Sequence, residues 1–171
     1  LGQTLARDFL VNGHDVLVLS RHPGQMRVPC RSLFWDGVTC GGWASEIDGA
    51  DVVINLAGRS VNCRYTPANR RAILDSRVNS TRAVGEAIAR AKRPPSVWLQ
   101  AATATIYAHR YDAANDEAIG ILAGNEAGVP ESWRFSAEVA QAWERELAAK
   151  RRAGLVAEQA VEKLTILRRE A

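Results

Sequence analysis

A serine hydroxyl and an arginine guanidinium are adjacent near the start of the chain, where an apolar run ends. The run at residues 15–19 is followed by Ser20-Arg21-His22, and this turn contains no carboxylate. A hydroxyl and a guanidinium can both donate hydrogen bonds to a phosphate. In dinucleotide-binding folds an acid at such a strand end binds the ribose of NAD, whereas an arginine accommodates the 2′-phosphate of NADP. Ser20 and Arg21 therefore favour NADP over NAD; a solvent-facing arginine in a turn is the alternative.

A glycine at the second position could serve the same ligand. In a dinucleotide fold the first strand runs into a glycine-rich turn, and the pyrophosphate lies on the N-terminus of the next helix. The last glycine of that turn lies just inside the helix, where a side chain would hold helix and sheet apart. Gly2 fits this position, because a helix starting at Leu1 would be followed by a buried strand. The alternative is that Gly2 is simply a residue near a chain end.

These residues need strands and helices to bring them together, and the sequence predicts an alternation of the two. An amphipathic helix is expected from residue 1 to Asn12-Gly13, with Leu1, Leu5 and Phe9 on its apolar face, and a strand that is apolar on both faces follows. The later predicted elements are strands at 32–35, 52–57, 97–102 and 164–167, helices at 67–90 and 136–150, a weak helical segment at 43–47 and a long loop at 112–131.

Strands that alternate with helices predict a parallel sheet with right-handed crossovers. We therefore expect an α/β fold, a doubly wound parallel sheet of the Rossmann type, as a single incomplete domain over residues 1–171, with residues 16–19 and 52–56 in that one sheet. Thr66-Pro67 is typical of a helix start. The residues expected to face inward from the two long helices are Ile73, Val84 and Ile88, and then Val139, Trp143 and Leu147.

The composition excludes several classes of protein. The chain has 171 residues and a formal net charge of +3, and its basic residues form no stripe interleaved with aromatic side chains, so we expect no nucleic-acid partner. Cys30, Cys40 and Cys63 have no metal-like spacing, which predicts free thiols in a reducing cytoplasm and no metal site. No apolar stretch approaches the roughly 20 residues of a membrane span, so no membrane partner is expected.

Four segments resemble a known family. They are INLAGRSV at 54–61, ILDSRVNSTRAVGEAI at 73–88, ATATIYA at 102–108 and FSAEVAQAWE at 135–144. The chain resembles the atypical or extended short-chain dehydrogenase/reductase proteins that are named NAD-dependent epimerase/dehydratase-like or sugar-nucleotide epimerase-like. Members have a complete Rossmann domain and a smaller C-terminal region. The resemblance therefore implies a strand and a glycine-rich turn ahead of Leu1, and a substrate-side region after the last strand, as parts that this sequence lacks.

The resemblance also implies residues that contact the cofactor. In the family a segment NxAG at the end of the fourth strand lines the nucleotide, and Asn55, Ala57 and Gly58 match it here. Small residues let the backbone approach a cofactor, although a glycine at a strand end can equally serve the geometry of the turn.

One arginine on the long helix has two interpretations. Arg77 stands where relatives often present an asparagine toward the active site. Its guanidinium could hold a phosphate or a carboxylate, as a ligand of the cofactor site. It could equally pair with a surface acid, either Asp75 or Glu86.

The family pattern places hydroxyl groups after the fifth strand. A serine or threonine there hydrogen-bonds the substrate carbonyl or hydroxyl, and this position falls on Thr103, with Thr105 and Tyr107 close behind. Extended members then use a Tyr-x-x-x-Lys pair for acid–base chemistry. Phe135 and Val139 stand in those two places here, so catalysis would need another acid. The candidates are, in order, Tyr107, then Tyr111 or His109, and last Glu117.

Three functions are compatible with these residues. The first is an NADP-dependent oxidoreductase or epimerase-like enzyme for a small substrate that bears a hydroxyl or carbonyl, with nucleotide sugars among the candidates. A nicotinamide would exchange hydride with that substrate while Thr103 orients its oxygen. The second is a regulatory module that binds NADP without turnover, which the absent Tyr-Lys pair supports. The third is an inactive fragment of the first.

Overall fold

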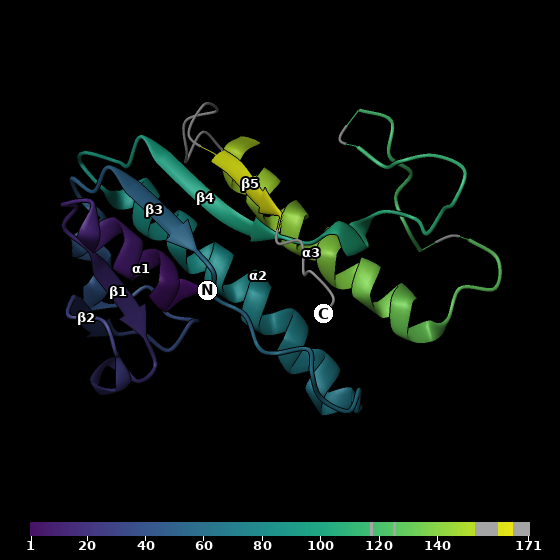
Figure 1. Cartoon of the computed structure of the whole chain (residues 1–171), viewed down its shortest axis with the longest axis horizontal. Coiled ribbons are helices and arrows are strands. Elements are labelled where there is room, and N and C mark those ends of the chain that lie inside the picture. Colours follow the sequence, from purple (N-terminus) through teal and green to yellow (C-terminus); the bar gives the residue numbers. More distant parts are fainter. Residues whose placement is uncertain (117, 125, 153–160, 166–171) are drawn as a thin grey trace.

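The computed structural model describes residues 1–116, 118–124, 126–152 and 161–165. In chain order the elements are α1 (Gly2–Val11), β1 (Leu17–Ser20), a 3₁₀ helix (Pro23–Gln25), β2 (Arg31–Phe34), a 3₁₀ helix (Gly42–Ile47), β3 (Val52–Asn55), α2 (Pro67–Arg90), β4 (Val97–Ala102), a 3₁₀ helix (Ala104–Ile106), α3 (Glu131–Arg152) and β5 (Val161–Thr165). Strands and α-helices alternate from β3 onward, whereas β1, β2 and β3 follow one another with short 3₁₀ helices between them (Figure 1). The α/β architecture expected from the sequence is confirmed.

The described strands form two parallel sheets. β1 pairs with β2, and the second sheet has the strand order β3-β4-β5. In the second sheet Val52 lies opposite Val97, and Asn55 lies opposite Gln100. The strand arrows of both sheets point toward the same side of the molecule (Figure 1). Because the pairing is parallel, the carboxyl ends of the strands in each sheet meet at one edge.

The expectation that residues 16–19 and 52–56 share one sheet is wrong for the described structure. β1 and β3 are not hydrogen-bonded neighbours, and no strand of the described ranges joins the two sheets. The alternation of apolar segments identifies strands, but it does not specify which distant strand each one pairs with. β1 is also half-buried along its length rather than covered on both faces.

Helix α2 begins and ends as predicted. The hydroxyl of Thr66 accepts a hydrogen bond from the backbone N–H of Asn69 at 3.2 Å, which satisfies a donor that the first turn would otherwise leave free. The three side chains expected to face inward, Ile73, Val84 and Ile88, are all buried. Local capping and a long apolar stripe therefore define this helix from its sequence.

Helix α3 and strand β5 begin earlier than predicted. Helix α3 starts at Glu131 rather than at residue 136, and the carboxylate in its first turn interacts favourably with the helix dipole. Its predicted inward residues, Val139, Trp143 and Leu147, are buried. Strand β5 covers Val161–Thr165 rather than 164–167, and residues 166 and 167 lie outside the described residues.

Helix α1 ends at the predicted pair of residues but buries little of its predicted apolar face. Asn12 is the C-cap, and Gly13 follows with φ of +83°, a conformation that suits glycine. Leu1 is 62% exposed, whereas Leu5 and Phe9 are half-buried and Ala6 is buried. Only part of the apolar face that the sequence predicts for this helix is therefore buried.

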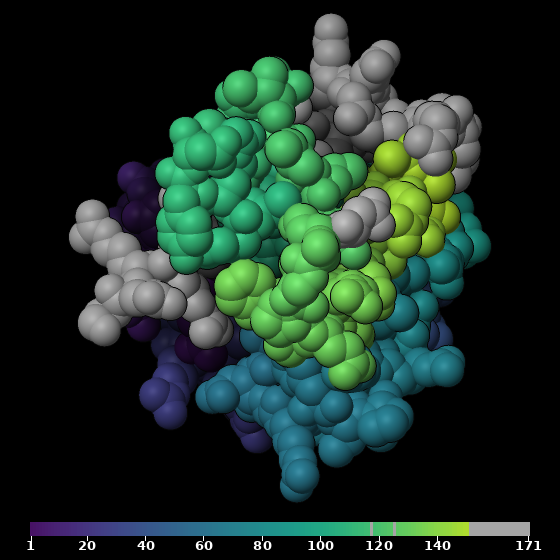
Figure 2. Space-filling model, turned by 90° about the vertical axis from the view of Figure 1, so that its right-hand side faces the viewer, coloured from purple at the N-terminus to yellow at the C-terminus, as the bar shows by residue number. Residues whose placement is uncertain are grey.

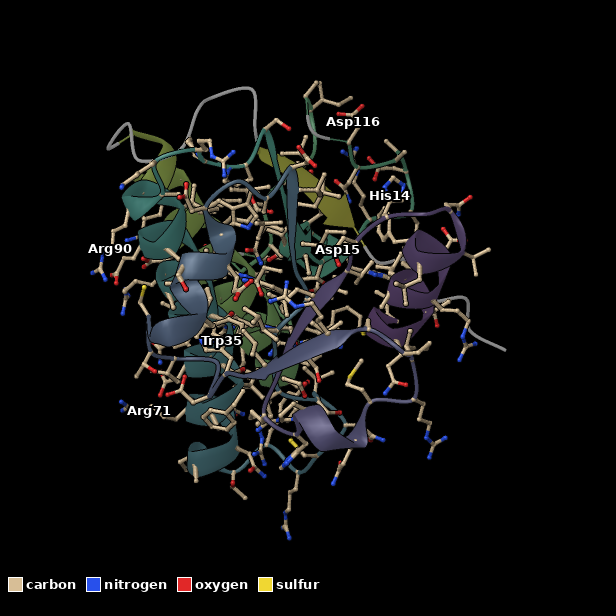
Figure 3. All side chains as sticks on the ribbon, turned by 90° about the vertical axis from the view of Figure 1, so that its left-hand side faces the viewer. His14, Asp15, Trp35, Arg71, Arg90 and Asp116 are labelled. Carbon is tan, nitrogen blue, oxygen red and sulfur yellow. The ribbon has the colours of Figure 1, made fainter. Side chains whose placement is uncertain are left out.

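Three tryptophans meet in the main core, together with apolar side chains of α2 and Leu147 of α3. The rings of Trp35, which Figure 3 labels, and Trp43 are 5.0 Å apart, and both indole N–H groups donate to the carbonyl of Thr39 at 3.0 Å. Trp98 of β4 is fully buried, and its indole N–H has no partner among the described residues. The core thus unites both sheets with the two long helices.

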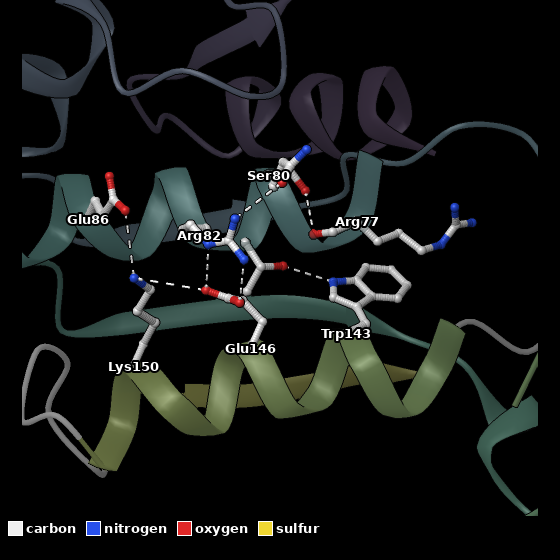
Figure 4. Close-up of polar contacts among 9 residues, drawn as sticks. Arg77, Ser80, Arg82, Glu86, Trp143, Glu146 and Lys150 are labelled. Carbon is white, nitrogen blue, oxygen red and sulfur yellow. Dashed lines mark hydrogen bonds and ion pairs between the residues drawn. The ribbon is translucent and has the colours of Figure 1, made fainter. Parts of the chain in front are cut away.

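A buried hydrogen bond joins α2 to α3. The indole N–H of Trp143, labelled in Figure 4, donates to the hydroxyl of Thr81 at 2.9 Å. Both residues are buried. Beside it, the guanidinium of Arg82 binds the carboxylate of Glu146 through two nitrogens, at 3.2 and 3.0 Å. A bidentate pair of this kind fixes the relative position of two helices as well as holding them together.

The Thr81–Trp143 bond yields a stability prediction. Replacing Thr81 by Val keeps the shape of the side chain but leaves the buried indole N–H of Trp143 unpaired. We expect the free energy of unfolding to fall by about 1–3 kcal/mol, measured by urea unfolding.

The matched control is Thr4→Val on the exposed face of α1, where the hydroxyl has no described partner. It should leave the free energy of unfolding nearly unchanged. If both variants lowered the free energy of unfolding equally, the Thr81–Trp143 hydrogen bond would not be a specific source of stability.

Candidate functional site

The candidate site lies at the carboxyl ends of the strands. Ligands of open parallel sheets bind outside this edge, where loops leave the strands. The structure brings Asn55, Ala57 and Gly58 to the end of β3 and Thr103 to the end of β4, which is its neighbour in the same sheet. Ser20 ends β1, in the other sheet.

The residues at the end of β1 have free donors. The hydroxyl oxygen of Ser20 accepts a hydrogen bond from the backbone N–H of His22 at 3.1 Å, so its own hydrogen is left to donate. Arg21 is exposed and has no hydrogen bond or ion pair with any residue the structure describes. A hydroxyl and a guanidinium that are free to donate hydrogen bonds, with no carboxylate in the same turn, fit a phosphate group.

The sequence predicts that a side chain at position 2 would hold helix and sheet apart, but among the described residues no atom lies close enough to exclude one. Gly2 is the first residue of α1, and a Cβ atom added there would lie 3.8 Å from Leu56 Cδ1. That separation is an ordinary van der Waals contact, so an alanine would fit. A role for Gly2 in a phosphate-binding turn stays a prediction.

The side chain of Asn55 makes structural hydrogen bonds within the protein. It is buried, its amide nitrogen donates to Gln100 Oε1 at 3.0 Å, and its amide oxygen accepts from the backbone N–H of Ala57 at 3.0 Å. These bonds hold the end of β3 to β4 and shape the turn toward Gly58. Gln100 was not among the residues expected at the site, although a glutamine inside the apolar strand β4 is a signal for a buried polar partner.

Arg77 reaches from α2 across to the turn after β3. A Cβ atom added at Gly58 would lie 3.4 Å from Arg77 Cζ, and Arg77 Nη1 donates to the carbonyls of Arg59 and Ile73 at 3.2 and 3.0 Å. The guanidinium also lies 5.3 Å from the centroid of the Trp143 ring, which is a cation–π distance. Burial lowers the pKa of Arg77 below its usual value.

The surface ion pair that was one alternative for Arg77 is absent from the described structure. Arg77 pairs with neither Asp75 nor Glu86, and Glu86 instead lies 3.9 Å from both Arg90 and Lys150. A half-buried guanidinium whose described partners are carbonyls and an aromatic ring still carries its full positive charge. This arrangement leaves Arg77 able to attract an anionic group.

Thr103 and Thr105 form a small hydroxyl pair after β4. Thr103 is the N-cap of the 3₁₀ helix Ala104–Ile106, and its hydroxyl oxygen accepts from the backbone N–H of Thr105 at 3.3 Å. The two hydroxyl oxygens are 3.1 Å apart. One hydroxyl hydrogen can satisfy this pair, so the other is available to a substrate oxygen.

Tyr107 is covered by the loop that follows it. The backbone N–H of Ala108 donates to the carbonyl of Ile121 at 2.7 Å, and Tyr107 forms an isolated antiparallel bridge with Leu122. A Cβ atom at Gly120 would lie 2.5 Å from the ring carbon Cε1 of Tyr107, so the loop approaches the ring more closely than any side chain would allow. The predicted loop is confirmed, and it packs on Tyr107.

Two of the other acid candidates, His109 and Tyr111, are exposed. His109 contacts the rings of Tyr111 and Trp133, with centroids 4.6 and 5.1 Å apart, and Tyr111 is 93% exposed. Glu117 lies outside the described residues. Figure 2 shows the loop and the start of α3 together in the middle of one face of the molecule, with the start of α2 below them.

Phe135 and Val139 form an apolar cluster with Ile73. The ring of Phe135 is buried and meets the ring of Tyr65 edge-on, with centroids 5.4 Å apart and an angle of 73° between the planes. The guanidinium of Arg70 lies 5.1 Å from the centroid of Phe135. Tyr65 directly precedes the helix cap Thr66, and no sequence pattern indicates its contact with Phe135.

Two features are absent from the described ranges. No group of three or more His, Cys, Asp or Glu side chains there could hold a metal ion. Among the same residues, no helix combines the length and apolar character needed to cross a membrane. All three cysteines are free thiols, as the sequence predicts.

The chain matches a known protein family. A family model described as the NAD dependent epimerase/dehydratase family matches residues 1–121. The epimerase family protein SDR39U1 of Bos taurus is 30% identical over 120 residues, which are 68% of this chain and 38% of that protein. The epimerase family protein YfhF of Bacillus subtilis is 35% identical over 114 residues, 63% of this chain and 35% of that protein.

Solved structures share the fold. Human SDR39U1 (isoform 2), crystallised with NADPH, has a TM-score of 0.68 at 22% identity and covers 96% of this chain and 48% of its own. MoeE5 in complex with UDP-glucose and NAD has a TM-score of 0.66 at 17% identity and covers 96% and 49%. The likeness establishes a Rossmann-like α/β fold. The chain spans less than half the length of each of these relatives.

The bonds of Asn55 give a prediction about stability. Asn55→Ala leaves the buried oxygen of Gln100 and the backbone N–H of Ala57 without their partners. We expect the free energy of unfolding in urea to fall by about 1–3 kcal/mol. Asn62→Ala, at an exposed position, is the control and should change it little. An Asn55→Ala protein as stable as wild type would refute the structural role.

An ion pair in the loop gives a prediction about pH. The guanidinium of Arg110 binds the carboxylate of Asp112 at 2.7 Å and lowers the pKa of Asp112 to about 2. Because this pKa is below the ordinary 3.8, the pair supports the loop at neutral pH and is lost as pH falls through about 2.

Arg110→Gln should raise the pKa of Asp112 toward 3.8, measured by carboxyl ¹³C NMR. The pKa of Asp36 is lowered by hydrogen bonds from Thr39 and Val38, so it should not respond to this change. If the pKa of Asp112 stays at its wild-type value, Arg110 is not the cause of the shift.

Proposed function

This chain belongs to the NAD-dependent epimerase/dehydratase family, and we propose that it binds NADP as the cofactor of an oxidoreductase or epimerase-like reaction. The proposed substrate is a small molecule with a hydroxyl or carbonyl group, and nucleotide sugars are included because MoeE5, a structural neighbour, was crystallised with UDP-glucose. The reaction is proposed to take place in the cytoplasm, where the free thiols of the three cysteines would stay reduced.

The observation that carries the choice of NADP is the donor set at the end of β1. Arg21 is exposed and unpaired among the described residues, Ser20 has a hydrogen to donate, and no carboxylate lies in residues 20–22. A carboxylate there would repel the 2′-phosphate and favour NAD. The structural neighbours include a protein with NADPH and a protein with NAD, so the donor set of this chain supports the choice.

The remaining cofactor contacts are proposed for the edge formed by β3 and β4. Gly2 would face the pyrophosphate from the start of α1. Ala57 and Gly58 would let the backbone approach the nucleotide, and Asn55 would hold their turn in place through its bond to Ala57. Arg77, behind Gly58, would attract an anionic group of the bound ligand.

The chemistry divides between cofactor and protein. When bound, the nicotinamide supplies or accepts the hydride. Thr103 would hold the substrate oxygen with the hydroxyl hydrogen that the Thr103–Thr105 pair leaves available. A tyrosine hydroxyl would exchange the proton of that oxygen, and Tyr107 is the candidate in the turn after β4.

A second function, binding of NADP without turnover, is favoured by one observation. Phe135 and Val139, which replace the Tyr-x-x-x-Lys pair, are buried in an apolar cluster and can neither exchange a proton nor carry a charge. Following NADPH absorbance with a panel of carbonyl substrates distinguishes the two functions. Oxidation of NADPH supports the enzyme, and binding without oxidation supports the regulatory module.

Arg21→Ala tests the cofactor choice. It should weaken binding of NADPH more than binding of NADH by roughly 1.5–3 kcal/mol, because only NADPH has the 2′-phosphate that loses a charge-assisted hydrogen bond. Both affinities can be measured by fluorescence titration of the reduced cofactors. Arg27→Ala removes a nearby exposed arginine and should weaken neither. Equal losses for both cofactors in Arg21→Ala would contradict the proposal.

A further inference from the structure

Phe34 is a large apolar side chain that the fold leaves in solvent at the end of β2. It is 64% exposed, and it belongs to neither of the two apolar clusters that buried residues form in the described ranges. No other described aromatic ring packs against it. A single exposed apolar residue is ordinary on a protein surface, so the groups around this ring decide whether it can serve a ligand.

The pairing of β1 with β2 places the ring beside Ser20. Ser20 and Phe34 are partners in this parallel pair, and the backbone N–H of Trp35 donates to the carbonyl of Ser20 at 3.0 Å. The partners one position earlier, Leu19 and Leu33, both pack against the main core. Because successive side chains of a strand alternate between its faces, Ser20 and Phe34 project together from the opposite face, on backbones about 4.8 Å apart.

The turn that contains Arg21 lies on this same face. Ser32 comes two residues before Phe34 in β2 and therefore shares its face. The hydroxyl of Ser32 donates to the carbonyl of Pro23 at 3.3 Å. Pro23 ends the turn that begins at Ser20, and Arg21 within that turn is exposed and has no described partner. The ring of Phe34 and the free donors of the turn thus occupy one side of the β1–β2 pair.

A ligand held by residues 20–23 through a 2′-phosphate brings a flat base to this place. In NADP the phosphate is bonded to C2′ of the adenosine ribose, and the adenine is bonded to the adjacent C1′. A base and an aromatic side chain stack favourably through their flat π-faces. Tyr111 and Trp133 are also exposed, but both contact His109 in the region after β4. Among the described residues, Phe34 is therefore the exposed aromatic ring beside the phosphate donors.

We infer that Phe34 stacks on the adenine of the bound nicotinamide dinucleotide. This inference rests on the proposed function and assigns a residue to a part of the cofactor that the other contacts leave without one. The end of β1 supplies hydrogen-bond donors for the phosphate, and the end of β2 supplies a ring for the base. Adenine is common to NADPH and NADH, so Phe34 strengthens the binding of both cofactors, whereas Arg21 selects NADPH.

Cofactor affinity forms the first arm of the test. Phe34→Ala should weaken the binding of NADPH and NADH by the same factor, about 5- to 140-fold, which is the loss expected from one stacked base. Phe34→Tyr keeps the ring and should keep the wild-type affinity. Val11→Ala removes an apolar side chain that is 81% exposed on α1, and this control should weaken neither cofactor. Wild-type affinities in Phe34→Ala, or a loss confined to NADPH, would overturn the inference.

A nucleotide without nicotinamide forms the second arm. The probe is adenosine 2′-monophosphate, and the contact is detected by NMR as nuclear Overhauser effects between its adenine protons and a phenylalanine ring. The chain has three phenylalanines, so Phe34→Leu identifies the ring by removing its signals. Inorganic phosphate carries no base, and wild type and Phe34→Leu should bind it equally. Adenine contacts that persist in Phe34→Leu, or bound nucleotide without a phenylalanine contact, would contradict the stacking.

The two arms separate this inference from the function on which it rests. If the wild type binds neither NADPH nor NADH, the proposed function fails, and the adenosine 2′-monophosphate spectra still decide whether Phe34 contacts adenine. Cofactor binding that Phe34→Ala keeps at wild-type strength refutes the inference alone. Because Phe34 is exposed, its variants should keep the wild-type free energy of unfolding in urea. The adenine contacts are measured on the wild-type protein and do not depend on how the variants fold.

Discussion

The buried hydrogen bond between Trp143 and Thr81 is the interaction on which the arrangement of the site depends. An indole N–H removed from water must find an acceptor, and Thr81 supplies one from the neighbouring helix. The bond fixes the Trp143 ring, and the ring lies under the guanidinium of Arg77. Through Arg77 it reaches Gly58 and the turn after β3. A helix–helix contact thus sets the position of a charge at the end of the sheet.

The segments that carry the family resemblance have a structural explanation in this contact. Ser80 and Thr81, from the DSRVNST segment, are fully buried, and Ser80 donates back to the carbonyl of Arg77 at 3.0 Å. Trp143, from the later segment, meets them from α3. In this chain both segments therefore contribute to the packing of α2 against α3. Arg77 is the member of this group whose charge is left for a ligand.

Local signals allowed much of the fold to be predicted from the sequence. Helix α2 and strand β4 match their predicted bounds because a Thr-Pro cap and a continuous apolar run act over neighbouring residues. The start of α3 was missed because the glycine, alanine and asparagine before it favour a loop. The separation of β1 from β3 could not be predicted, since strand pairing depends on segments far apart in the chain.

The candidate site was predictable only in part, for the same reason. Ser20, Arg21 and Gly58 follow predicted strands and Asn55 lies inside one, so their edge could be inferred. The bond from Asn55 to Gln100 and the contact of Tyr65 with Phe135 join distant segments, and no spacing rule connects them. The chemical partners of a residue are fixed by tertiary structure even where the residue type is informative.

Trp98 fills space in the core although its indole N–H has no hydrogen-bond partner among the described residues. Its indole fills space between the sheet and α2, yet its N–H has no partner in the part of the chain that the structure describes. An unpaired buried donor costs about 1–3 kcal/mol, whereas an aromatic side chain of this size removes about 150–250 Å² from water and gains more. Burial of the ring therefore outweighs the hydrogen bond that its N–H lacks among the described residues.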